Sequence, residues 1–391
     1  MSTLILTCST GQGHNSCADA IKDYFEAQGE PCEVRDALAF VSKPLSRFIC
    51  WGHVTIYRHL HQLFRIGYGY SEKHSGMFEP ASGIYKLLAK GADPIRDCIT
   101  EGGYTRVICT HVFASLMITE LQKRYHLPIA AGLVATDYTC NPGTKESTVN
   151  LYFIPDMPLS VYYECPDISD EQIISSGIPI RQMFYKQWEK AEAKAAFHIP
   201  ASHQHLLMMC GSMGCGPMKK LTGQLLKKLP DTVELTVICG TNKALKKKLT
   251  RKYGHRKNLH ILGYVDNMSQ MMDSADLYLT KPGGISVTEA ANKNLPMVFI
   301  DAVAGCEEYN KIYFIRRGAA KTGTTVRDIA DICVDILGKP KKLKKMRQNL
   351  ESMDKQNAAQ VIYEEMKKLS PVSDPAPYAP KVRTEERVCL E

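Results

Sequence analysis

The stretch with the most chemical content is Lys281–Ala290, which reads KPGGISVTEA. It follows Asp276–Thr280, whose Leu-Tyr-Leu centre has the composition of a strand. Pro282–Gly284 can turn the backbone without steric hindrance, so the amides of Ile285 and Ser286 would point outward at a helix N-terminus. Phosphate oxygens bind at such helix ends. The spacing therefore predicts a phosphate site between a strand and a helix.

Glu289 extends this site. It lies three residues after Ser286, so the two side chains would share one helix face. A carboxylate in that position can bind a ribose diol, and phosphate donors beside a ribose ligand predict a sugar-nucleotide site. The alternative is an ordinary strand–turn–helix junction, which Gly283 and Gly284 alone do not exclude.

Two other glycine-rich loops follow apolar runs. In Ser9–Asn15 the loop would open a helix and place His14 at its N-terminus, where the dipole and desolvation favour a neutral imidazole. A neutral histidine can act as a general base, although a packing or capping histidine is the alternative. The second loop, Cys210–Pro217, offers backbone amides and the Ser212 hydroxyl to phosphate.

Asp137 ends a further apolar run, within Thr136–Tyr138. We predict that it orients or assists a base across a cleft. The alternative is a helix-capping or turn aspartate.

Apolar runs alternate with helical patterns along most of the chain, which is typical of parallel α/β architecture. The expected strands are Leu4–Cys8, Arg106–Thr110, Ile129–Ala135, Leu151–Ile154, Leu206–Cys210, Glu234–Cys239, Leu259–Leu262, Leu277–Thr280 and Met297–Ile300. A first helix is expected at Ser16–Gln28, and a charged helix at Trp188–Phe197 within a linker. We therefore predict two doubly wound, Rossmann-like domains with ligands in the cleft between them.

The predicted organisation is a first domain over residues 1–180, a linker over 181–200, a second domain over 201–369 and a Pro-rich disordered tail over 370–391. A chain of 391 residues exceeds the ~250–300 at which a single core stops growing. No apolar run is long enough to span a bilayer, and the first residues lack a basic leader, so we expect a cytoplasmic location. The 14 cysteines are scattered, without a CxxC pair, which favours free thiols and argues against zinc.

The positive charge is concentrated in the second half. Residues 1–186 hold 16 Lys or Arg against 19 Asp or Glu, whereas residues 187–391 hold 33 against 22. A basic domain suits a polyanionic ligand or an anionic membrane, although Lys243–Lys252 and Lys339–Arg347 also read as solvated helix faces. Aromatic residues do not interleave with these basic runs, so no nucleic-acid partner is expected.

A different pattern occupies Ala37–Ser71, which contains no Asp or Glu. Aromatic rings favour the headgroup level of a bilayer and cations favour anionic lipid, so the stretch predicts attachment to a membrane surface. A core-facing aromatic helix with a basic outer face is the alternative. The residues expected to make this contact are Arg47, Phe48, Trp51, Tyr57, Arg58, Phe64 and Arg65.

Taken together and in their order, these motifs resemble one family from Thr3 to about Leu369. It comprises the monogalactosyldiacylglycerol synthases and bacterial processive diacylglycerol glucosyltransferases, with a more distant similarity to the lipid-linked N-acetylglucosaminyltransferase of peptidoglycan synthesis. The matching segments are Ser9–His14, Ala135–Tyr138, Ser176–Pro179, Gly211–Gly214, Gly263–Met268, Lys281–Ala290, Pro296 and Gly305–Asn310. The resemblance implies a GT-B fold and inverting transfer of a hexose from a UDP-sugar to diacylglycerol or a glycosyl-diacylglycerol, at the inner face of the cell membrane.

The resemblance also implies roles for individual residues. His14 resembles the general base and Asp137 its acidic partner. The residues that resemble the donor site are Gly13, Gly211, Ser212, Gly283, Gly284, Ile285 and Ser286 near the phosphates, Val265 and Met268 near uracil, Glu289 at the ribose, and Glu307, Glu308 and Asn310 at the hexose. No Asp-x-Asp occurs, which agrees with metal-independent transfer in which amides and helix dipoles stabilise the leaving UDP.

Two departures from the family pattern bear on activity. Asn141 and Asp156 stand where histidines are frequent in the family. They leave open an altered acceptor, such as a polyprenyl-linked lipid, or a UDP-sugar sensor without activity. A sugar-nucleotide epimerase or hydrolase of similar fold is a further alternative, and the choice between glucose and galactose stays open.

Overall fold

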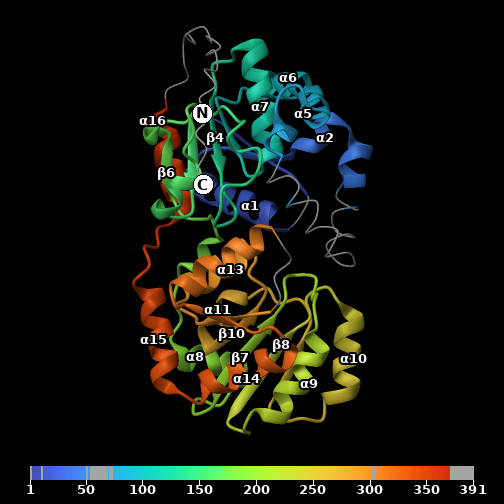
Figure 1. The fold of residues 1–391 in the computed structure, drawn as a ribbon, viewed down its shortest axis with the longest axis vertical. Helices are drawn as coiled ribbons and strands as arrows, with labels where there is room; N and C mark the ends of the chain where they lie inside the picture. Colours follow the sequence, from blue (N-terminus) through green and yellow to red (C-terminus); the bar gives the residue numbers. More distant parts are fainter. Residues whose placement is uncertain are drawn as a thin grey trace, which may run out of the picture.

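The computed structural model describes residues 2–9, 12–49, 52, 69, 74–300 and 305–369. Within these residues the strands form two six-stranded parallel sheets, one in each of two lobes, with helices on both faces (Figure 1). The predicted α/β architecture of two doubly wound domains is confirmed. The predicted tail over 370–391 lies outside the described residues, as does most of Ala37–Ser71, the stretch without Asp or Glu.

The first lobe is built on the sheet β2-β1-β3-β4-β5-β6. Its central strands read as continuous apolar runs, such as Leu4-Ile5-Leu6, because helices cover both faces of a parallel sheet. The strands are β1 (Thr3–Thr7), β2 (Cys32–Asp36), β3 (Arg106–Cys109), β4 (Ala130–Val134), β5 (Leu151–Ile154) and β6 (Ile173–Ser175). One face packs on α1 (Gln12–Ala27) and α16 (Ala358–Lys368), and the other on α2 (Ala37–Val41), α5 (Gly83–Leu88), α6 (Ala92–Gly102) and α7 (Val112–Tyr125).

The helices of the first lobe lie between these strands. They are α1 (Gln12–Ala27), α2 (Ala37–Val41), η1 (Ser75–Phe78), α5 (Gly83–Leu88), η2 (Ala89–Gly91), α6 (Ala92–Gly102), α7 (Val112–Tyr125), η3 (Met157–Tyr162) and η4 (Asp170–Gln172). Residues 43–49 are also helical.

The second lobe is built on the sheet β12-β11-β10-β7-β8-β9. Its strands are β7 (Gln204–Met209), β8 (Val233–Ile238), β9 (Leu259–Leu262), β10 (Leu277–Thr280), β11 (Met297–Phe299) and β12 (Ala320–Thr322). The helices are η5 (Gln182–Phe184), α8 (Lys190–Ala196), α9 (Met218–Lys228), α10 (Lys243–Tyr253), α11 (Met268–Ser274), α12 (Gly284–Asn292), α13 (Cys306–Arg316), α14 (Val326–Leu337) and α15 (Pro340–Glu351).

The strands expected from the sequence are all present, within a few residues of their predicted ends. Three strands were not predicted: β2, β6 and β12. Each lies at a sheet edge and is short or half-exposed, so it lacks the apolar run that marks a central strand. The linker helix expected at Trp188–Phe197 is present as α8.

The last helix, α16, differs from the predicted domain boundary. We assigned residues 201–369 to the second domain, but α16 packs against α1 in the first lobe (Figure 1). Its buried Ile362 and Met366 join the core formed by Ile21 and Phe25 of α1. The chain therefore crosses between the lobes twice, and the apolar face of α16 explains why it returns.

The strand order of each sheet fixes where ligands can bind. In the first sheet successive connections diverge between β1 and β3, and in the second between β7 and β10. At such a switch point the loops leave in opposite directions and open a crevice at the carboxyl ends of the strands. The loops after β1, β7 and β10 carry the glycine-rich motifs found in the sequence.

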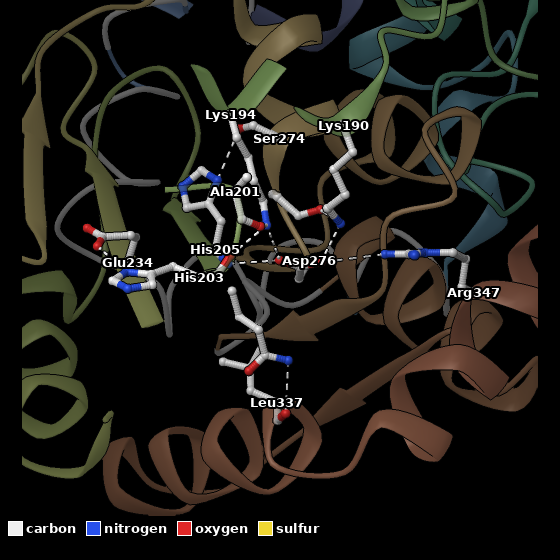
Figure 2. A network of polar contacts seen from close by, with 12 residues as sticks. Lys190, Lys194, Ala201, His203, His205, Glu234, Ser274, Asp276, Leu337 and Arg347 are labelled. Atoms are coloured by element: carbon white, nitrogen blue, oxygen red, sulfur yellow. Dashed lines mark hydrogen bonds and ion pairs between the residues drawn. The ribbon is translucent and has the colours of Figure 1, made fainter. Parts of the chain in front are cut away.

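The opposite end of the second sheet holds a buried polar network, shown in Figure 2. Asp276 forms ion pairs with Lys190 and Lys194 of α8 and lies within 4.0 Å of Arg347 of α15. Burial opposes ionisation of Asp276, but the cations outweigh it and lower the pKa of its carboxyl group. One carboxylate thus links α8, which follows the first crossing between the lobes, to α15, which precedes the second.

His205 completes this network. It is fully buried, contacts the hydroxyls of Ser274 and Thr236 at 3.0 and 2.8 Å, and has a pKa lowered to about 3 by burial. A neutral ring suits these partners, because a hydroxyl can donate to one ring nitrogen and accept from the other.

We predict that Asp276→Asn lowers the free energy of unfolding by about 3 kcal/mol, because it leaves Lys190 and Lys194 near a buried site without their carboxylate. Urea unfolding followed by circular dichroism measures this. Asp335→Asn is the matched control, since it removes a carboxylate that pairs with two lysines at the surface, and we expect little change. Equal losses in both variants would contradict the anchoring role of Asp276.

Candidate active site

His14 lies in the first turn of α1 at the switch point of the first sheet. Its Nδ1 is 2.8 Å from the backbone oxygen of Thr110, at the end of β3. A carbonyl oxygen can only accept, so Nδ1 carries the proton and the neutral ring holds its lone pair on Nε2. The fold thus fixes the tautomer that a general base requires.

His111 is a site residue that the sequence analysis missed. It caps α7, where its Nδ1 accepts a hydrogen bond from the Phe113 amide at 3.0 Å. Its ring meets the His14 ring edge-to-face, with centroids 4.6 Å apart. The neutral His111 ring therefore carries its proton on Nε2, the opposite tautomer to His14. Its position directly after a central strand, Cys109-Thr110-His111, was the available signal.

Thr136, and not Asp137, contacts the imidazole of His14. The Thr136 Oγ1 lies 3.2 Å from His14 Nδ1 and 3.5 Å from the Asp137 carboxylate. Asp137 itself accepts hydrogen bonds from Asn310 Nδ2 at 2.7 Å, from the Gly284 amide and from the Cys306 thiol. The acidic partner predicted for His14 thus faces the second lobe, with the Thr136 hydroxyl between the carboxylate and the imidazole.

The Asp137 carboxyl group is in an unusual electrostatic position. Burial raises its pKa to about 6, opposed by the Asn310 hydrogen bond and reinforced by nearby Glu307. The group also lies at the N-terminus of α12, where we predicted phosphate to bind. In this conformation the protein's own carboxylate bonds to the first amide of that helix.

Gly284 makes this arrangement possible. A Cβ on Gly284 would overlap the backbone oxygen of Thr136 and lie 2.9 Å from Asp137 Oδ1. At Gly283, by contrast, the closest atom to an added Cβ would be Glu307 Oε1 at 3.8 Å. Gly284 is therefore required for close approach of the two lobes, a role that the turn motif alone did not reveal.

Ile285 and Gly13 extend the contact between the lobes. The Ile285 side chain packs against a core cluster in each lobe, and a Cβ on Gly13 would lie 3.7 Å from it. The N-termini of α1 and α12 thus face each other across the cleft. His14 is one residue from this contact, so the candidate base and the candidate phosphate site are adjacent.

Asn310 holds the loop after β4 against the second lobe. It is fully buried, accepts from the Tyr138 amide at 2.7 Å and donates to the Pro282 oxygen at 2.9 Å as well as to Asp137. The Tyr138 ring inserts between Tyr313 and Phe314, with its hydroxyl 3.0 Å from that of Thr288. Asn310 is therefore an interlobe contact in this structure, and its role toward the hexose stays a prediction.

The glycine-rich loop after β7 packs closely against the loop that follows β8. Gly211 and Gly214 have φ values of +67° and +54°, and a Cβ on Gly214 would overlap the backbone oxygen of Cys239. The Ser212 oxygen accepts from the Thr241 amide at 2.9 Å, which holds the loop in place. Gly211 and Ser212 are half-buried beside the switch point, where the sequence placed them.

Lys281 and Glu307 form a buried ion pair in this crevice, with 3.2 Å between Nζ and Oε1. The sequence analysis quoted Lys281 within its motif but gave it no role. A Cβ on Gly211 would lie 4.0 Å from the Lys281 side chain, so the ammonium group is beside the loop that we predict to bind phosphate. Glu308, in contrast, points outward and pairs with Lys311.

The other predicted donor residues lie on the same edge of the second sheet. Glu289 is buried, 3.9 Å from Arg181, and burial raises its pKa to about 7. Met268 begins α11 and is buried, whereas Val265 is half-buried in the preceding loop. Ser286 lies half-buried in the first turn of α12. Their roles toward uracil, ribose and phosphate stay predictions.

Asp156 makes a second link between the lobes. It accepts hydrogen bonds from Tyr313 Oη at 2.5 Å and from Arg317 Nη2 at 2.6 Å. A pocket beside it is lined from α12 by Thr288, Ala291 and Asn292, a different face from Ser286 and Glu289. Asp156, which stands where a histidine is frequent in the family, thus connects the first lobe to α13 of the second lobe.

The acceptor side is described only in part. Arg47 and Phe48 are exposed, with 67% of Phe48 accessible. The other five residues of the predicted membrane contact lie outside the described residues: Trp51, Tyr57, Arg58, Phe64 and Arg65. Among the helices that the structure describes, none is long and apolar enough to cross a bilayer.

A metal site was not expected, and the structure does not test that expectation. In the described parts of the chain no group of three or more His, Cys, Asp or Glu side chains is arranged to hold a metal ion. The described cysteines are all free, in keeping with the prediction of free thiols.

Each lobe matches a known protein family in sequence. Residues 14–180 match the family model "Monogalactosyldiacylglycerol (MGDG) synthase", and residues 219–353 match "Glycosyl transferases group 1". A processive diacylglycerol beta-glucosyltransferase of Bacillus pumilus is 26% identical over 371 residues, which cover 93% of this chain and 94% of that protein.

Solved structures share the fold. The crystal structure of Acinetobacter baumannii MurG has a TM-score of 0.61 at 13% identity, over 94% of this chain and 99% of that one. A UDP-GlcNAc 2-epimerase from Neisseria meningitidis, bound to UDP-GlcNAc, also has a TM-score of 0.61 at 14% identity, over 94% of this chain and all of that one.

The protein is a glycosyltransferase of GT-B architecture. Its two lobes face each other with the glycine-rich motifs at the switch points of their sheets, and the family and structural matches agree with this class. Within that class the chain is similar to the monogalactosyldiacylglycerol synthases and the processive diacylglycerol glucosyltransferases, which confirms the resemblance seen in the sequence.

We predict that Gly284→Ala separates or distorts the lobes, because the added methyl group cannot coexist with the Thr136 oxygen. The expected result is a thermal midpoint lower by several degrees, measured by differential scanning calorimetry. Gly283→Ala is the control, since its methyl group would make only an ordinary contact, and we expect little change. A Gly284→Ala protein as stable as Gly283→Ala would contradict the close approach.

The raised pKa of Asp137 predicts a pH dependence of stability. Between about pH 4 and 6 the folded protein keeps a proton that the unfolded chain loses. This contribution is therefore fully present below pH 4 and lost as the pH rises through 6. Asp137→Asn mimics the protonated group, so its stability relative to wild type should rise between pH 4.5 and 7.5.

Urea unfolding at these two pH values measures the difference. Asp231→Asn, which changes an exposed aspartate, is the control for removing a carboxylate. An Asp137→Asn protein whose stability relative to wild type does not change with pH would contradict a raised pKa at Asp137.

Proposed function

We propose that the protein transfers a hexose, glucose or galactose, from a UDP-sugar to the hydroxyl of diacylglycerol or a glycosyl-diacylglycerol, with inversion at the anomeric carbon. The observation that carries this proposal is the position of His14. Its Nδ1 proton is committed to the Thr110 oxygen, which leaves Nε2 as the basic atom. It also lies beside the N-terminus of α12, across the cleft. The similarity to processive diacylglycerol beta-glucosyltransferases supports the lipid acceptor.

In the proposed reaction UDP-sugar binds the second lobe at its switch point. The α12 amides, the Ser212 hydroxyl and the Lys281 ammonium would contact the diphosphate, and Glu289 the ribose. His14 Nε2 would take the proton of the acceptor hydroxyl as its oxygen attacks the anomeric carbon. The bond between that carbon and the diphosphate breaks, and UDP leaves with the electron pair.

Fixed positive charge would stabilise the leaving group. The N-terminus of α12 carries the positive end of its dipole, and Lys281, which is paired with Glu307 in this structure, would add its ammonium charge on contact with the diphosphate. We propose that these groups make a divalent metal unnecessary. Asp137 bonds to the first amide of the helix, so donor binding would have to share or replace that hydrogen bond.

The acceptor would reach the first lobe from a membrane surface. Arg47 and the exposed Phe48 support peripheral attachment at the cytoplasmic face, with the ring at headgroup level and the cation near anionic lipid. An acceptor arriving from that surface would present its hydroxyl on the side of the cleft that holds His14.

The direct test is UDP release from UDP-glucose and from UDP-galactose, each with diacylglycerol in anionic vesicles, with a polyprenyl phospholipid, and without acceptor. Mass spectrometry of the lipid products identifies the transfer. We expect release that depends on diacylglycerol and yields a hexosyl-lipid. Release without lipid would indicate hydrolysis or epimerase chemistry instead, and UDP binding without turnover would indicate a sensor.

We predict that His14→Ala lowers the rate of transfer at least 100-fold, because general-base catalysis contributes about 10²–10⁴-fold. UDP affinity, measured by calorimetry, should stay within a few-fold of wild type. His126→Ala, at the exposed end of α7, is the control and should keep its activity. Near-normal transfer by His14→Ala would remove this residue from the role of base.

A further inference from the structure

The helix α10 is the most basic element of the second lobe. Residues 235–265 contain eight Lys or Arg and no Asp or Glu. Six of these cations lie in α10, and all six are exposed: Lys243, Lys246, Lys247, Lys248, Arg251 and Lys252. Within the described residues none of the six forms an ion pair.

The helix has two distinct faces. Leu249 is fully buried, and Leu245 and Tyr253 pack beside it against the lobe. Residues four apart share a face, so Lys243, Lys247 and Arg251 form a row on the opposite side. We call Lys243, Lys247 and Arg251 the α10 row. Fixing so many unpaired like charges on one helix is unfavourable unless an external anion neutralises them.

The α10 row lies on a definite edge of the molecule. In Figure 1, α10 forms the right edge of the lower lobe, and α2 lies on the right side of the upper lobe. Residues 43–49, which include Arg47 and the exposed Phe48, follow α2 closely in the chain. The other strongly basic helix, α15, lies at the left edge (Figure 1), and two lysines near its start pair with Asp335.

We propose that the α10 row is a second membrane contact, which binds the anionic headgroups of the same bilayer that receives Arg47 and Phe48. The inference rests on the proposed attachment of the first lobe to a membrane. Juxtamembrane Lys and Arg are attracted to anionic lipid, and the attraction weakens within a Debye length, so only the edge nearest the bilayer contributes strongly. With one contact in each lobe, the bilayer would hold both lobes along one edge.

A bilayer fits this surface better than a nucleic acid does. The α10 row contains no aromatic ring on which bases could stack, and Tyr253 of the same helix packs toward the lobe. The exposed aromatic residue Phe48 instead belongs to the first lobe, where it suits insertion at headgroup level.

The test is co-sedimentation of the full chain with vesicles of phosphatidylcholine containing phosphatidylglycerol, and with phosphatidylcholine alone. One variant carries Lys243→Gln, Lys247→Gln and Arg251→Gln. The matched control carries Lys341→Gln, Lys344→Gln and Lys345→Gln, three exposed lysines of α15. Both variants lose three positive charges and keep residues of similar helix propensity.

We expect the α10 variant to partition about 100-fold less onto the anionic vesicles, from the attraction of each basic residue to anionic lipid. The α15 control should stay within about threefold of wild type. Equal losses in both variants would show an effect of net charge alone and overturn the proposal. So would unchanged binding of the α10 variant, or wild-type protein that does not bind anionic vesicles.

Failure of this inference is distinguishable from failure of the proposed function. Sedimentation measures binding without turnover, so it gives an answer even if no hexose is transferred. Transfer to diacylglycerol dispersed in neutral detergent tests the reaction without a bilayer. The α10 variant should match wild type in that assay, since the α10 row does not belong to the donor site or the catalytic site.

Discussion

The structure depends on the close approach of the loop after β4 to the N-terminus of α12. Gly284 permits it, because any side chain would overlap the Thr136 oxygen, and Asn310 maintains it with three hydrogen bonds. Through this contact Tyr138 enters the core of the second lobe. The same contact holds Thr136 beside His14. The packing of the two lobes and the surroundings of the candidate base therefore depend on the same residues.

The contact also places charge where it is costly. Asp137 is buried between the lobes, and its carboxylate shares the end of α12 with the predicted diphosphate site. Burial raises its pKa, while the Asn310 amide and the helix amide favour the ionised form. A diphosphate bound at this helix end, as proposed, would compete with the lobe contact for the same hydrogen-bond donors, which would couple donor binding to the packing of the lobes.

Away from the cleft, the second lobe separates its buried from its exposed charges. The cations of α8 and α15 gather around Asp276 and hold these two helices together. The cations of α10 have no such partner within the described residues and face outward on one edge. The excess of positive charge in the second half of the sequence thus has two parts. One part gathers around the buried Asp276, and the other is exposed on α10. The net charge alone could not separate them.

The order of residues along the chain was enough to predict the strands with continuous apolar runs, the turns at Pro282–Gly284 and Cys210–Pro217, and the place of His14 at the start of a helix. These features depend on residues close together in the chain. Only the tertiary structure decided the tautomer of His14, which is set by Thr110, the pairing of Lys281 with Glu307, the nearness of His111 and the return of α16 to the first lobe. The edge strands β2, β6 and β12 were missed for a related reason, since pairing with a neighbour defines them. Local periodicity specifies an element, but a contact such as that of Asp137 with Asn310, 173 residues away, exists only once the two lobes pack together.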